Sequence, residues 1–302
     1  MRKIILNTIL LITSLICFSC FSDKHESDAY GVFEAKEIMV SSENNGKLLS
    51  LNLEEGDFIE KGVVVGCIDT FQLYLQYRQL ELSITAALTK RPDIPAQLRT
   101  LQEKLNTLEK EQIRVANLVE ANAVSTKKLD DVNAEITMTK SQIQATKSTL
   151  NIQTQAILEE VEVMRIQMLQ VEDALSKCHI KNPLSGTVLK KYIEVNELVG
   201  QGRPLFKIAD LTNMYIKIYV TEDMLSSLKI GQETEIRIDT KEGKNKIFNG
   251  NITWISPKAE FTPKMIQTKD ERVNLVYAVK VSFVNDGSAK IGMPGDVVFK
   301  KK

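Results

Sequence analysis

The sequence contains few of the residue types that enzymes and cofactor-binding proteins need. Its 302 residues include one tryptophan, two histidines and four cysteines. No second histidine or cysteine stands at metal-ligand spacing from His25 or His179, apart from Cys178, which adjoins His179. G-x-S-x-G, phosphate-loop and G-x-G-x-x-G motifs are all missing from the sequence. We therefore predict no catalytic residues, no metal site, no cofactor and no enzymatic activity.

The chain also lacks an excess of charge of one sign. It has 39 basic and 39 acidic residues, and loss of Arg2 and Lys3 with a leader would leave 37 against 39. A near-neutral chain has no bulk attraction for the phosphate backbone, so we predict no nucleic-acid binding. The hydrophobic fraction of 43% excludes a wholly disordered chain.

Glycine is absent from the middle of the chain. None of the fourteen glycines lies between Gly66 and Gly186, and the only aromatic residues of that stretch are Phe71, Tyr74 and Tyr77. Glycine inside a helix costs about 1 kcal/mol relative to alanine. Its avoidance over such a length predicts long helices.

The amino terminus has the layout of a bacterial export signal, with a basic start followed by a short apolar run over residues 4–18. Residues 16–20 resemble a lipobox, in which the thiol of Cys20 takes a lipid; Cys17 and Phe18 depart from the usual pattern. We predict a lipoprotein signal over residues 1–20 and a linker over 21–30. Ordinary cleavage and an uncleaved anchor are the alternatives. Of the remaining cysteines, Cys67 and Cys178 are either buried apolar residues or a disulfide.

Two stretches, residues 40–69 and 180–209, align at a constant offset of 140. The matched pairs are Gly46 and Gly186, Leu49 and Leu189, Glu54 and Glu194, Gly62 and Gly202, and Ile68 and Ile208. Each unit reads as short strands separated by glycine turns, so we expect Gly46, Gly62, Gly186 and Gly202 in turns, some with positive φ. Together the units can close a small sandwich that neither could bury alone.

The glycine-free insertion carries apolar residues in a heptad pattern. Eight of them stand seven apart: Leu129, Ile136, Ile143, Leu150, Ile157, Met164, Val171 and Cys178. Such a repeat predicts a supercoil against a partner helix. Residues 71–121 and 126–177 give two arms of matched length, each reaching about 75 Å. Two prolines interrupt the first arm at residues 91–95. A self-associating structural coiled coil is the alternative.

After residue 210 apolar and polar residues alternate, as at Ile216, Ile218 and Val220, which predicts half-buried antiparallel strands closed into a small β-barrel. The predicted fold class is α+β. It combines a split sheet domain (31–69 and 178–210), an antiparallel helical hairpin (70–177) and a β-barrel with a membrane-proximal region (211–302).

The two glycine-patterned halves resemble a biotinyl/lipoyl domain, split by a helical insertion. This arrangement resembles the periplasmic adaptors, or membrane fusion proteins, of the haemolysin-secretion type. Residues 255–263, 267–268, 271–272, 275–281 and 292–295 look like the barrel region of adaptors that serve ABC-type exporters. The junction has no Met-Lys-Met or Asp-Lys turn, so covalent biotin or lipoate, and with it a carrier subunit, is not expected.

The resemblance implies a non-enzymatic adaptor in the periplasm of a Gram-negative bacterium, anchored to the inner membrane. It would form a ring, usually of six copies, between an inner-membrane pump and a TolC-type outer-membrane channel. Arg114, Leu118 and Ser125 match the spacing of the family's channel-binding tip motif. The alternatives are an adaptor for a proton-driven pump and a structural coiled-coil lipoprotein.

Overall fold

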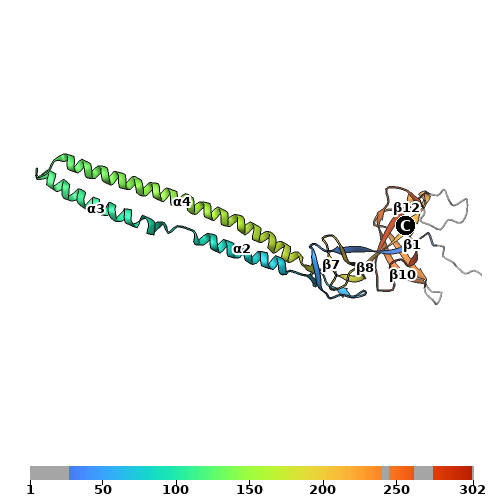
Figure 1. Ribbon diagram of the computed structural model, residues 1–302. Helices are drawn as coiled ribbons and strands as arrows, with labels where there is room; N and C mark the ends of the chain where they lie inside the picture. The colour runs from blue at the N-terminus through green and yellow to red at the C-terminus, as the bar shows by residue number, and fades with distance from the viewer. Residues whose placement is uncertain (1–26, 240–244, 262–274, 301–302) are drawn as a thin grey trace, which may run out of the picture.

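The computed structural model describes residues 27–239, 245–261 and 275–300. The molecule is elongated, with a long helical hairpin at one end, a β-barrel at the other and a small β-sandwich between them (Figure 1). Two long strands, β1 (Ala29–Ser41) and β8 (Pro204–Val220), run through both sheet regions and pair with each other antiparallel.

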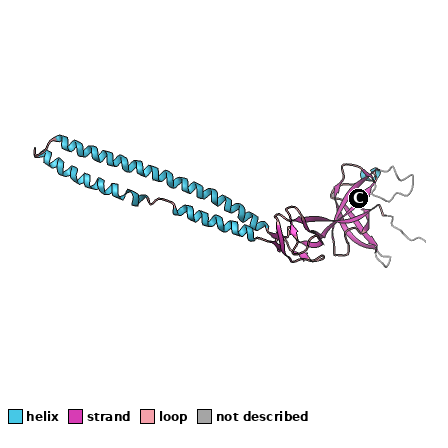
Figure 2. Cartoon of the chain, viewed as in Figure 1, coloured by secondary structure: helices cyan, strands magenta, loops and turns pink. Residues whose placement is uncertain are grey.

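Three helices form the hairpin. The first arm consists of α2 (Phe71–Thr89) and α3 (Ile94–Glu120), and the second is the single helix α4 (Thr126–Lys177), which packs against both. The first arm is interrupted by a short loop, as the prolines predict (Figure 2). Asp93 starts α3 again, because its carboxylate accepts a hydrogen bond from the backbone N–H of Ala96 at 3.1 Å.

On the face of α4 that packs against the first arm, the sequence interval between successive buried residues changes near the middle of the helix. Toward the tip its buried and half-buried residues alternate three and four apart, and at Leu150 two steps of four follow each other. The residues of this seam are Leu129, Val132, Ile136, Thr139, Ile143, Thr146, Leu150, Thr154, Ile157, Val161, Met164, Met168 and Val171. The change is an inserted step of four in the heptad pattern, which locally alters how the helices wind around each other.

The sandwich has two four-stranded layers. One is formed by β5 (His179–Lys181), β4 (Val64–Ile68), β2 (Gly46–Leu51) and β7 (Leu198–Val199), in that order. The other is formed by the adjoining ends of β1 and β8 with β6 (Gly186–Lys191) and β3 (Phe58–Ile59). Leu48, Ile68, Val188, Leu205 and Ile208 fill the space between them.

The two repeat units exchange strands. β2 and β6 begin 140 residues apart, as do β3 and β7, and β4 and β8. The short strand β3 of the first unit pairs with β6 of the second, and β7 of the second pairs with β2 of the first. Each layer is therefore completed by the other unit, and neither unit forms a full layer alone.

The four glycines that were expected in turns divide into two pairs. Gly62 and Gly202 lie in turns with φ of 87° and 82°. Gly46 and Gly186 instead are the first residues of β2 and β6. A Cβ on Gly186 would lie 2.4 Å from the carbonyl oxygen of Ala209, so this position needs glycine for close strand approach.

The β-barrel is closed by six strands. They are β8, β1, β13 (Pro294–Phe299), β9 (Glu233–Asp239), β10 (Asn245–Ile255) and β12 (Leu275–Val284), and β12 pairs back onto β8. Two small elements, α5 (Glu222–Leu225) and β11 (Glu260–Phe261), adjoin it. Its core includes Phe33, Ile216, Ile236, Ile252 and Val281. The predicted boundaries at residues 31 and 210 therefore fall inside β1 and β8, which continue from one sheet region into the other.

Candidate functional site: the hairpin tip

The turn between α3 and α4 is held at both of its ends. Asn122 has φ of 53°, its N–H bonds to the carbonyl of Val119 at 2.9 Å, and the N–H of Ala123 bonds to the carbonyl of Leu118 at 2.8 Å. This pair of bonds is the Schellman arrangement that ends a helix with a left-handed residue. Ser125 then starts α4, because its hydroxyl oxygen accepts the N–H of Lys127 at 3.2 Å.

Arg114 and Leu118 lie one helical turn apart on the outer side of α3. Their neighbours Val115 and Val119 are buried and half-buried, and both belong to the cluster between the two arms. Leu118 is 39% exposed, and the Arg114 guanidinium pairs with Glu111 at 2.7 Å. The hydrogen bond and charge of Glu111 raise the pKa of Arg114, which is charged at any physiological pH.

The structure thus brings Arg114, Leu118 and Ser125 to the end of the hairpin, all three of them exposed. They offer an arginine with several donors, an apolar side chain and a hydroxyl that also caps a helix. Such a surface is suited to contact with another protein.

Side-chain hydrogen bonds and ion pairs join the two arms below the tip, and the sequence analysis did not predict them. Gln112 donates to Asn133 at 2.7 Å across the seam. Ion pairs of 3.1 Å join the arms outside it, between Lys104 and Glu135 and between Glu109 and Lys140. Residues 112 and 133 stand equally far from the turn in the sequence. This symmetry could indicate that the two side chains face each other, but only once the position of the turn is known.

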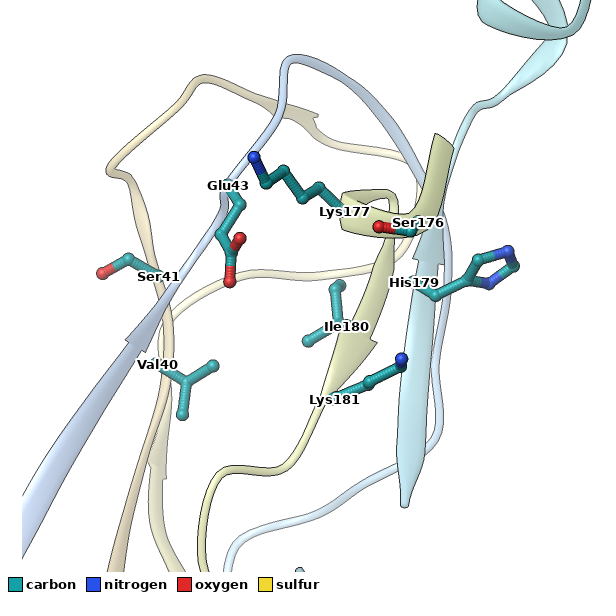
Figure 3. Close-up of a pocket in the computed structure, with 8 residues that line it drawn as sticks. All are labelled: Val40, Ser41, Glu43, Ser176, Lys177, His179, Ile180 and Lys181. Atoms are coloured by element: carbon teal, nitrogen blue, oxygen red, sulfur yellow. The ribbon is translucent and has the colours of Figure 1, made fainter. Parts of the chain in front are cut away.

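A shallow groove of about 250 Å³ lies where the hairpin meets the sandwich (Figure 3). Glu43, Lys177, His179 and Lys181 are among its lining residues, and the His179 ring points away from Glu43. Among the described residues, no three histidine, cysteine or acidic side chains gather closely enough to hold a metal ion.

Cys67 and Cys178 are both free thiols in the structure. They lie near each other, because Cys67 pairs with His179 across β4 and β5. Burial raises the pKa of both thiols, and Asn44 donates a hydrogen bond to the Cys178 sulfur at 3.3 Å. Cys178 is buried and packs in the sandwich core as a small apolar residue.

The predicted export signal, including Cys20, lies outside the described residues. Within residues 27–239, 245–261 and 275–300, no helix combines the length and apolar character that crossing a membrane requires.

Known proteins resemble this chain in both sequence and structure. No family model matches the chain. A UPF0194 membrane protein from Acidithiobacillus ferridurans is 24% identical, over 97% of this chain and 94% of the relative. The crystal structure of MacA from Actinobacillus actinomycetemcomitans matches with a TM-score of 0.56 at 19% identity, covering 89% of this chain and 76% of that one. The membrane fusion protein Spr0693 from Streptococcus pneumoniae R6 matches with a TM-score of 0.52 at 16% identity, covering 90% and 98%.

The chain has the fold of membrane fusion proteins, which the resemblance in sequence predicts. The similarity to a protein labelled as a membrane protein extends over nearly its whole length.

Proposed function

We propose that this protein is a non-catalytic periplasmic adaptor that joins an inner-membrane transporter to an outer-membrane channel of an efflux or secretion system. The observation that carries the proposal is the long hairpin with Arg114, Leu118 and Ser125 exposed at its end. The 52 residues of α4 span about 78 Å, far more than the sandwich needs for its own stability. An arm of this length is suited to reaching a distant partner.

In this proposal each part of the chain has its own role. The sandwich is a split lipoyl-like domain, as the exchange of strands between two units related by an offset of 140 residues supports. The hairpin is an antiparallel coiled coil, supported by the seam along α4. The barrel faces the transporter, and a lipid on Cys20 holds the chain to the inner membrane.

We infer that the transporter is an ABC-type exporter and the channel is of the TolC type. Support for the exporter comes from the resemblance of residues 255–261, 275–281 and 292–295 to the barrels of such adaptors. The intervening residues 262–274 lie outside the described part of the chain. Support for the channel comes from the spacing of Arg114, Leu118 and Ser125, all three of which are exposed. A proton-driven pump is the closest alternative partner.

The tip is tested by changing Arg114→Asp and Leu118→Ser separately in the full-length chain. Both side chains are exposed, so helix content and membrane association should stay at the level of the unchanged protein. Crosslinking to the outer-membrane channel and export should each fall at least about tenfold, since loss of one central contact costs more than about 1.4 kcal/mol. Glu103→Gln, an exposed change farther down α3, is the matched control.

Unchanged crosslinking in both tip variants would show that the hairpin does not dock through these residues. Absence of any channel from the complexes of the unchanged protein would favour a structural lipoprotein instead.

A further inference from the structure

The hairpin is joined to the sandwich mainly through its own two chain ends. Thr70 leads into α2, Cys178 follows α4, and the two ends lie side by side, since the N–H of Ile68 bonds to the carbonyl of Cys178 at 2.9 Å. Leu73 of α2 also packs against the sandwich core. Two adjacent connections of this kind form a hinge, so a further contact is needed to fix the direction of the hairpin.

Asn44, in the loop between β1 and β2, makes that further contact. Its amide nitrogen donates to the carbonyl of Ala174 in α4 at 3.0 Å and to the sulfur of Cys178 at 3.3 Å. Among the described residues, every other hydrogen bond that leaves the helices of residues 71–177 goes to a neighbour within four positions in the sequence. Asn44 and Ala174 are 130 positions apart.

The bond from Asn44 completes the end of α4. The last carbonyl groups of a helix have no partner within the helix. In a continuing helix the N–H of Cys178 would bond to the carbonyl of Ala174, but here it bonds to the carbonyl of Leu175 at 3.2 Å. The side chain of Asn44 supplies the donor that the carbonyl of Ala174 lacks.

The loop that carries Asn44 is itself fastened to the second repeat unit. The carbonyl of Ser42 accepts the N–H of Gly202 at 2.7 Å, and Oδ1 of Asn45 accepts the N–H of Gln201 at 2.7 Å. Within the loop the Ser42 hydroxyl donates to the carbonyl of Asn44 at 2.5 Å. Asn44 is therefore held by the sandwich on both sides of its contact with the hairpin.

The contact adds a third point of support at the base of the hairpin. Glu43, the residue before Asn44, lines the same groove as Lys177 in the last turn of α4 (Figure 3). The loop thus meets the end of α4 separately from the two chain ends. Glu159 lies about 27 Å along α4 from its end, so a swing of about 10° about the hinge would move it by about 5 Å.

We propose that Asn44 is a positioning residue that sets the direction of the hairpin relative to the sandwich. Only one consequence rests on the proposed function, namely that a fixed direction presents the tip to the channel. A partner that binds one direction of the hairpin binds less tightly when that direction is less populated. Asn44 would then strengthen a contact at the far end of the hairpin without touching the partner.

The first experiment measures the direction of the hairpin by pulsed electron paramagnetic resonance. The full-length protein carries spin labels at Glu159→Cys in α4 and Asn52→Cys in the sandwich, with Cys67→Ser to remove the more accessible native thiol. Asn44→Ala should widen the distribution of distances between the labels at least about twofold. Asn44→Asp should widen it as much, because a carboxylate has no N–H to donate and faces the negative end of the helix dipole.

Glu43→Gln is the matched control, because it changes the exposed residue next to Asn44 and leaves the hydrogen bonds of Asn44 in place. Its distance distribution should match that of the unchanged protein. All distances are compared well below the thermal transition, which circular dichroism follows for each variant. A lowered transition with an unchanged width in both Asn44 variants would show a role in stability alone and would overturn the proposal.

The second experiment records crosslinking to the outer-membrane channel by the same variants without labels. Asn44→Ala should reduce it about fivefold, although the tip residues are intact. A wider distribution in a protein that captures no channel even when unchanged would leave the role of Asn44 standing and remove the adaptor function. Channel capture with unchanged widths would do the reverse. A wider distribution with undiminished capture would contradict the consequence for docking.

Discussion

Asn182 makes three side-chain hydrogen bonds, two of which join the second repeat unit to the first. It is 1% exposed, and its amide nitrogen donates to the carbonyls of Ile59, Glu60 and Leu184 at 3.0, 3.0 and 2.6 Å. Ser42, its counterpart at the offset of 140, is also buried. The backbone N–H of Gly62 donates to the carbonyl of Asn182, and the backbone N–H of Gly202 donates to the carbonyl of Ser42. Each of these two bonds joins one repeat unit to the other.

The sequence predicts the glycines of this arrangement but not the asparagine. A glycine leaves a signal because its matched spacing repeats in the two units. Asn182 matches a serine, and its acceptors lie more than 120 residues away in the chain, except Leu184. Its role becomes visible only when the units are packed together.

We expect Asn182→Ala to lower the free energy of unfolding by about 2 kcal/mol, because it leaves buried carbonyl groups without a donor. Asn52→Ala is the matched control, since Asn52 lies in the same sandwich but is exposed, and its effect should stay within about 0.5 kcal/mol. Denaturant unfolding followed by circular dichroism measures both. Equal stabilities of the two variants would show that the three bonds contribute nothing net.

The break in the first arm and the change of spacing in α4 occur at the same height. The bond between Gln112 and Asn133 and the groove shared by residues 73–80 and 167–174 place Leu150 opposite residues 95–97. This is the first turn of α3, directly after the break. If the first arm were one continuous helix, it would have to change how it winds around α4 at this point. Two shorter helices, α2 and α3, can each pack on their own part of the seam without that change.

Most of the hairpin could be predicted from the sequence. The heptad positions, the length of both arms, the break near Pro92 and the Ser125 cap all depend on local spacing. The inserted step of four was not predicted, because Thr154 replaces an apolar residue at the changed position. This half-buried threonine instead satisfies its hydroxyl by donating to the carbonyl of Leu150 at 2.8 Å.

We expect the hairpin to be separable from the rest of the chain. Its two ends meet, since the N–H of Ile68 bonds to the carbonyl of Cys178 at 2.9 Å and Cys67 pairs with His179. Replacing residues 72–176 by a short flexible linker should therefore leave a folded, strand-rich protein that no longer captures the channel. Circular dichroism and a cooperative thermal transition report the fold. Loss of that transition would mean that the sandwich depends on the hairpin.

The whole molecule has a helical hairpin at one end and a β-barrel at the other, and continuous strands join the barrel to the sandwich between them. β1 and β8 pass from the sandwich into the barrel and pair along most of their length, so the two sheet regions share a backbone ladder. Sequence alternation predicted the strands, but it placed domain boundaries inside both of them. A strand that leaves one core and enters another keeps its alternation throughout, so alternation alone does not mark the crossing.

The central claim is that the tip and the barrel contact different membrane proteins. The most direct measurement places a photo-crosslinking residue at Leu118 in one full-length variant and at Trp254 on β10 in another, with Met138 on the outer hairpin as a third position. After irradiation of intact cells, each crosslinked partner is identified by mass spectrometry. The account predicts an outer-membrane channel from position 118, an inner-membrane transporter from position 254, and neither from position 138. The same partner from positions 118 and 254, or only copies of this chain from both, would contradict it.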